Sequence, residues 1–191
     1  MDLQTLISRQ NVIVTILAAG YFIATAALMP TAGNAHVDDK MPSMSAVRDD
    51  MVKASMSALR AKTGKLGEPK IEGKDPLAGK DAPALYFGAT KMNNSSDVVD
   101  KVVKENGGAA TLFVKTGDGY VRVATTMKKD DGSSALGTVL DANSPAIAMI
   151  TRGETYYGDA TIFGKPYATG YEPIKDASGN VIGIYFVGYM K

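Results

Sequence analysis

The sequence YYGDATIFGKPYATGYEPIKDASGNVIGIYFVG, residues 156–188, decides the fold. Its aromatic and β-branched residues alternate with small or polar ones, and turns such as ASGN interrupt the alternation. This pattern predicts three consecutive strands, at 155–164, 167–176 and 181–190. Because short turns connect strands that run in opposite directions, we expect an antiparallel sheet.

Strand and turn signals continue towards the N-terminus. The segments ATLFVK and YVRVATTM flank the turn TGDG and predict a hairpin. Two further segments predict short helices, capped by Ser95 or Ser96 in the first and by Ser144, ahead of Pro145, in the second. The remaining expected elements are strands at 84–90, 110–115, 120–127 and 135–141, and helices at 95–106 and 144–153.

A long helix is expected at residues 38–62, and a loop rich in Gly, Pro and Lys at 63–83. Such a helix must bury its apolar stripe, so we predict that it covers one face of the sheet. A flexible partner surface is the alternative for its many methionines. The stripe also contains the small Ser55, and its apolar members are Met41, Met44, Val47, Met51, Val52, Met56 and Leu59.

Residues 1–35 differ from the rest of the chain. A charge-free apolar run covers 11–29, and small residues follow at Gly33 and Ala35. This order predicts a secretory signal peptide cleaved after Ala35, with 36–191 as the single mature domain. The run approaches the roughly 20 residues that span a bilayer, so an uncleaved inner-membrane anchor is the alternative. Both readings place the domain outside the cytoplasm, as a periplasmic, secreted or anchored protein.

Composition excludes several classes of function. The formal net charge is +1, and the basic residues are scattered, which is unlike a nucleic-acid-binding protein. The chain has no cysteine and one histidine, His36. Disulfides, thiolate sites, histidine-based triads and histidine metal sites therefore have no residues to form them. We expect no catalytic residues, no metal and no cofactor.

Several motifs in the C-terminal hundred residues occur together and in order. They are ATLFVKTGDGYVRVATTMKKDDG, ALGTVLD, G-x-A-x-x-F-G-K-P-Y, Y-E-P-I-K-D and V-I-G-I-x-F-V-G. In these motifs the chain resembles a single Cache domain of the Cache 3/Cache 2 fusion type. The resemblance implies an α+β, PAS-like fold, with a long N-terminal helix on a five- to six-stranded antiparallel sheet and a pocket on the other face.

The same resemblance implies a sensory function. Family members lie outside the membrane in chemoreceptors, sensor kinases and cyclic-dinucleotide enzymes, and similar domains often bind small carboxylates or other small polar metabolites. No second hydrophobic span follows Met190-Lys191. We therefore expect a stand-alone domain that binds a small molecule and acts through a separate membrane receptor or sensor kinase, with a homodimer left open. An exported structural or interaction subunit without a ligand is the alternative, ahead of an enzyme.

The expected ligand site centres on Arg122. Alternation along 120–127 places Val121, Val123, Thr125 and Met127 on the core face and Arg122 on the opposite face. Arg122 can there hold a carboxylate through two hydrogen bonds. Tyr167, Tyr171 and one of Tyr156 or Tyr157 are expected to close around the ligand. The alternatives are that Arg122 pairs with an exposed acid and that the tyrosines only pack.

Overall fold

The structure is a computed structural model that describes residues 42–117 and 119–191. The expected export segment and the first residues of the expected long helix lie outside the described residues. The elements are α1 (Met44–Gly64), β1 (Pro69–Leu77), β2 (Lys80–Phe87), β3 (Thr90–Lys91), α2 (Asp97–Asn106), β4 (Ala109–Thr116), β5 (Gly119–Thr125), α3 (Ala146–Thr151), β6 (Tyr156–Ile162), β7 (Lys165–Lys175) and β8 (Val181–Met190).

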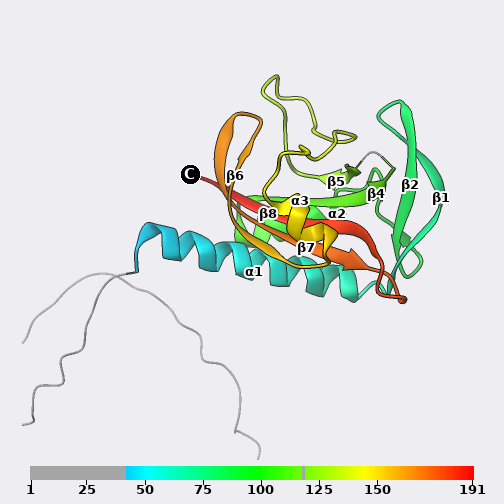
Figure 1. Cartoon of the computed structure of the whole chain (residues 1–191), viewed down its shortest axis with the longest axis horizontal. Helices are drawn as coiled ribbons and strands as arrows, with labels where there is room; N and C mark the ends of the chain where they lie inside the picture. Colours follow the sequence, from blue (N-terminus) through cyan, green and yellow to red (C-terminus); the bar gives the residue numbers. More distant parts are fainter. Residues whose placement is uncertain (1–41, 118) are drawn as a thin grey trace, which may run out of the picture. The chain divides into compact units, whose positions relative to one another are not determined.

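Five strands form the main sheet, in the order β5-β4-β8-β7-β6. Every neighbouring pair is antiparallel, as the alternating pattern predicted. The last strand in the chain, β8, lies in the middle of the sheet between β4 and β7 (Figure 1, red). Strands distant in sequence are therefore brought together by β8.

Helix α1 runs along one face of the main sheet (Figure 1). Its buried residues follow the helical spacing and include Val52, Met56 and Leu59. Ser55 is also buried, and its Oγ lies 2.7 Å from the hydroxyl of Tyr189 in β8. That hydroxyl donates a hydrogen bond to the carbonyl of Asn106 at the end of α2, at 2.6 Å. One tyrosine therefore links both helices to the central strand.

The prediction of a long helix covering the sheet is confirmed, but its stripe is shorter than expected. Met44 and Met51 are exposed, with 68% and 38% of their surface accessible. The first turns of α1 project beyond the edge of the sheet (Figure 1). Met51 directly precedes the buried Val52, so it lies at the level of the sheet but on a different side of the helix. Burial begins at Val52.

The main sheet is buried on both faces. On the side of α1 and α2, Leu112, Ala124 and Val187 belong to one hydrophobic core. On the other side, Phe113 and Tyr171 belong to a second core, which also includes residues of α3. This second face carries the cavity described below.

A β-bulge in the β4–β5 pair corrects the expected alternation along β5. Leu112 pairs with Ala124 and Phe113 pairs with Arg122, so Val123 has no partner in the register. Because of the extra residue, each later side chain of this strand lies on the opposite face of the sheet from the one that simple alternation predicts. Val123 and Ala124 consequently share the first core, whereas Met127 belongs to the second and not to the helix side.

The loop expected at 63–83 is wrong, because β1 and the start of β2 form a hairpin there. This hairpin and β3 make a separate three-stranded sheet. β1 is mostly exposed and buries only Leu77, so it has no hydrophobic alternation to detect. Backbone pairing and the turn at Ala78 and Gly79, both with positive φ, define the hairpin instead.

The strand expected at 135–141 is also wrong, since this segment forms only an isolated bridge, Val121 to Val139. It still follows the outer edge of β5. The amide of Arg122 donates to the carbonyl of Thr138 at 3.0 Å, and the amide of Leu140 donates to Tyr120 at 2.8 Å. The segment therefore covers the free edge of β5 and holds Thr138 beside Arg122.

Replacement of Leu59 with alanine tests the packing of α1 on the sheet. Leu59 is fully buried, so truncation should lower the free energy of unfolding by about 2–5 kcal/mol. Urea denaturation would measure the change. The matched control is Ser57→Ala on the exposed side of the same helix, which should change stability by less than about 0.5 kcal/mol. Equal effects of the two substitutions would contradict the described packing.

Candidate functional site

A cavity of about 410 Å³ lies on the second face of the main sheet. That volume is in the range of small-molecule sites. Strands β5 and β7 contribute its deepest residues, and the segment before α3 and the β6–β7 turn contribute its walls. The lining residues are Arg122, Val139, Leu140, Asp141, Ser144, Thr161, Ile162, Phe163, Gly164 and Tyr171.

Arg122 is the buried cation of this cavity. Only 3% of its surface is accessible, and no ion pair among the described residues includes it. Its Nη1 donates to the hydroxyl of Thr138 at 2.8 Å, and this hydroxyl donates in turn to the carbonyl of Ala135 at 2.7 Å. Its Nε is buried and has no partner in the described part of the chain.

Two aromatic rings lie against the guanidinium of Arg122. Its Cζ is 4.8 Å from the ring centre of Phe113 and 5.3 Å from that of Phe163. Such contacts attract a cation through the electron-rich ring face. They stabilise the charge without neutralising it or satisfying its hydrogen-bond donors.

The electrostatics of the cavity follow from burial. Desolvation lowers the pKa of Arg122, although an arginine remains protonated at neutral pH. Desolvation also raises the pKa of Tyr171 to about 12, against the opposing effect of the Arg122 charge. At neutral pH the interior of the cavity therefore combines a full positive charge with an uncharged phenol. A buried charge without a partner is unfavourable, so the site is suited to an anion.

The family model of the Cache 3/Cache 2 fusion domain matches residues 32–191. The chain belongs to this family. Cache domains are extracellular domains that sense small molecules. A search of curated proteins finds no match to the chain. The family and the α+β fold predicted from the C-terminal motifs are both confirmed.

Of the five residues expected at the ligand site of this Cache domain, Arg122 and Tyr171 line the cavity together. Tyr156 is a neighbour of Tyr171, with ring centres 6.1 Å apart, and its hydroxyl donates to the carbonyl of Asp159 at 2.8 Å. Tyr167 packs against the same core but is not part of the lining. These two tyrosines support the cavity from outside.

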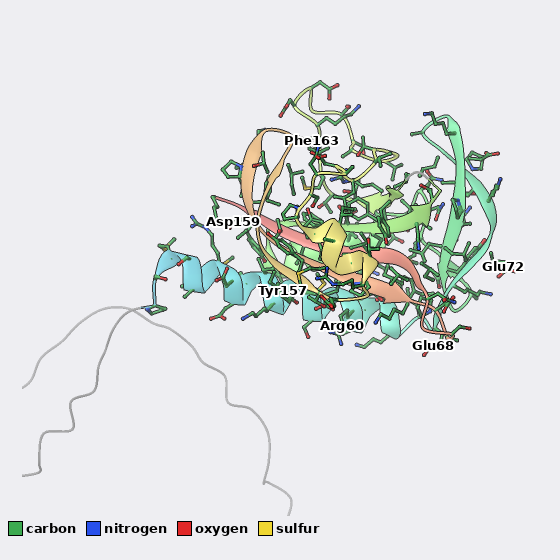
Figure 2. The ribbon with its side chains drawn as sticks, in the orientation of Figure 1. Arg60, Glu68, Glu72, Tyr157, Asp159 and Phe163 are labelled. Atoms are coloured by element: carbon green, nitrogen blue, oxygen red, sulfur yellow. The ribbon has the colours of Figure 1, made fainter. Side chains whose placement is uncertain are left out.

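Tyr157 lies on the other face of the sheet, beside α1. Its hydroxyl donates to the carboxylate of Glu172 at 2.7 Å, and the same carboxylate pairs with Arg60 of α1 at 3.2 Å. Figure 2 labels Tyr157 and Arg60. Burial and the Glu172 carboxylate raise the pKa of Tyr157. Because neighbouring residues of a strand face opposite sides, only Tyr156 of this pair can face the cavity side.

Most residues that line or support the cavity were not expected from the sequence, and Thr138, Ser144 and Phe163 are examples. Thr138 had no visible signal, because it lies in an irregular segment whose path only the fold reveals. Ser144 was expected to cap α3, but it makes no capping bond, and its buried Oγ has no partner among the described residues. Phe163 was visible only as part of the motif F-G-K-P-Y.

Asp141 adds a negative charge to the outer part of the cavity. It is exposed, and its Oδ1 accepts the amide of Asn143 at 2.9 Å. A second anionic group on the ligand would be repelled here. The lining therefore favours one negative charge at Arg122 over two.

Within 42–117 and 119–191, no three His, Asp or Glu residues lie close enough to hold a metal. A smaller cavity of about 160 Å³ lies between α1 and the β6–β7 edge, lined in part by Asp49, Lys53 and Tyr157. None of the helices in the described part of the chain is long and apolar enough to span a membrane.

Replacement of Arg122 with methionine tests whether burial of this charge lowers the free energy of unfolding. Methionine keeps an apolar stem against Phe113 and Phe163 and removes the uncompensated charge. Replacing buried charges with apolar residues is often neutral or stabilising by roughly 1–4 kcal/mol. We expect the free energy of unfolding to stay constant or rise in urea denaturation. A loss above about 2 kcal/mol would mean that Arg122 is a structural residue.

The raised pKa of Tyr171 predicts alkaline sensitivity. A group whose pKa is higher in the folded state contributes stability below its unfolded value, near pH 10, and loses it as the pH approaches about 12. At roughly 1.4 kcal/mol per pKa unit, the loss from Tyr171 reaches up to about 3 kcal/mol. Tyr171→Phe should reduce the fall in stability over this range. Denaturation curves of the wild type and the variant at pH 9 to 12 would measure the difference, and equal falls in both would contradict the prediction.

Proposed function

We propose that this Cache domain binds a small carboxylate at Arg122 and passes the binding event to a separate protein. The observation that carries the proposal is the buried guanidinium with a free Nε and no acid partner among the described residues. Thr138 accepts from Nη1, and no hydrogen bond in the described part of the chain uses Nε or Nη2. A carboxylate that reaches this edge would accept two parallel hydrogen bonds from it.

The lining narrows the class of ligand. A volume of about 410 Å³ suits a small metabolite rather than a peptide or a nucleotide. The cavity offers one cation at depth and one acid, Asp141, further out. A ligand with a single carboxylate therefore fits this charge pattern better than a di- or tricarboxylate. The hydroxyl of Tyr171 and the Oγ of Ser144 offer additional polar contacts.

The open cavity also supports sensing over a purely structural function. A Cache domain that served only as an interaction subunit would be expected to fill this space with its own side chains, because empty volume and a lone buried charge both lower stability. Here Phe113 and Phe163 pack against the guanidinium, and the space beyond it stays open.

The route of the signal and the location of the protein form the second half of the proposal. We propose that residues 1–35 direct export, either by cleavage after Ala35 or as a retained anchor, and that 36–191 act as one sensory domain. The partner would be a membrane receptor or sensor kinase that contacts the domain outside the cytoplasm. The extracellular location of Cache domains supports this arrangement.

A thermal-shift experiment on the full chain tests the ligand. The panel contains acetate, propionate, butyrate, lactate, succinate and citrate, each beside its uncharged amide. At about 100 times the dissociation constant, a bound ligand adds roughly 2.7 kcal/mol, which raises the Tm by several degrees. We expect monocarboxylates to raise the Tm and amides to leave it unchanged.

Two variants show whether the shift comes from the proposed site. Arg122→Met should abolish it. The matched control, Arg152→Met, removes an exposed arginine that pairs with Glu154 and should retain the full shift. If carboxylates and amides act alike, or if the shift survives in Arg122→Met, the proposed site is wrong.

A further inference from the structure

The β6–β7 turn has an unusual residue at its tip. Ile162 pairs with Lys165, so Phe163 and Gly164 form a two-residue loop. Both have positive φ, 47° for Phe163 and 73° for Gly164. Two-residue hairpin turns of this kind favour Asn-Gly, because asparagine tolerates the left-handed region far better than a bulky aromatic residue does. The backbone at Phe163 is therefore strained.

The turn itself does not need a phenylalanine. Asparagine or glycine would form the same turn with less strain, and Ile162 already anchors the end of β6 in the second core. The neighbouring ion pair between Lys165 and Asp130, at 3.3 Å, is exposed at both ends and holds the turn only weakly. Strained residues of this kind persist where the side chain has a function.

What phenylalanine adds is a ring over the guanidinium. The ring centre of Phe163 is 5.3 Å from Cζ of Arg122, and the residue lines the cavity. Figure 2 shows Phe163 at the tip of the hairpin, far from Tyr157 and Arg60 beside α1. The β6–β7 turn, which is distant in sequence from β5, thus places an aromatic ring beside Arg122.

We infer that Phe163 is the specificity-determining residue of the cavity: its ring closes the outer side of Arg122, so that carboxylates with an apolar body next to the charged group bind more tightly than carboxylates with a hydroxyl there. This inference rests on the proposed function. Together with Ile162 and Leu140, the ring forms an apolar surface beside the guanidinium. On the side of Phe163, a ligand hydroxyl next to the carboxylate would lose its water without gaining a partner, because the ring has no hydrogen-bonding group.

The first test needs no ligand. Phenylglyoxal modifies accessible guanidinium groups, and mass spectrometry of the full chain measures the rate at Arg122. Phe163→Asn should raise this rate at least tenfold and leave the Tm equal or higher, because asparagine relieves the strained turn. Phe163→Tyr keeps the ring and should retain slow modification. An unchanged rate in Phe163→Asn overturns the inference.

A second variant guards against loss of folding. Phe163→Gly also adopts positive φ and should behave like Phe163→Asn, with Arg152 as the internal reference for an exposed arginine. If both variants lower the Tm by more than several degrees, Phe163 is a packing residue and the inference is overturned.

The third measurement concerns specificity. Butyrate and 2-hydroxybutyrate differ by one hydroxyl, and titration calorimetry should show butyrate bound at least tenfold more tightly by the wild-type protein. Phe163→Asn should reduce that preference to less than threefold. Failure of both ligands on the wild type counts against the proposed function, while the modification rate at Arg122 still decides whether Phe163 covers it. Binding with an unchanged preference in Phe163→Asn overturns the inference alone.

Discussion

The cavity depends on one uncompensated buried charge. Arg122 lies inside the second core with one hydrogen bond to Thr138 and two aromatic neighbours, but without an acid among the described residues. Burial of a guanidinium without an acidic partner lowers the stability of the folded protein. Thr138 accepts a hydrogen bond from the guanidinium, the two rings lie against it, and its Nε has no partner among the described residues. In the function that we propose, a ligand carboxylate compensates this charge, so stability and binding would be opposed at this residue.

The topology explains how Arg122 is buried and also lines a cavity. β5 is an outer strand of the main sheet, and the irregular segment after Met127 returns along its free edge. That segment closes one side of the space above the sheet, and the β6–β7 hairpin closes the other. α1 and α2 cover the opposite face, so the first core lies on one side of the sheet and the second core, with the cavity, lies on the other.

The sequence motifs were sufficient for the family and the α+β fold, and alternation placed Arg122 on the face of the sheet that carries the cavity. Arg122 precedes the bulge at Val123, so alternation counted from the turn places it correctly, whereas the same count fails for Met127. The β1–β2 hairpin was missed because an exposed strand shows no alternation. Thr138 could not be predicted, because it acts through the path of an irregular segment. Tyr156 and Tyr157 could be separated only once the facing of β6 was known.

The central position of β8 has a consequence for how the molecule assembles. β4 and β7 each hydrogen-bond to β8 and not to each other, so β5-β4 and β7-β6 are two separate hairpins until β8 joins them. The main sheet therefore cannot be completed until β8 has been synthesised, since the joining strand follows both hairpins in the chain. Folding must wait for a long-range closure, which is intrinsically slow. Both walls of the cavity remain apart until that closure occurs.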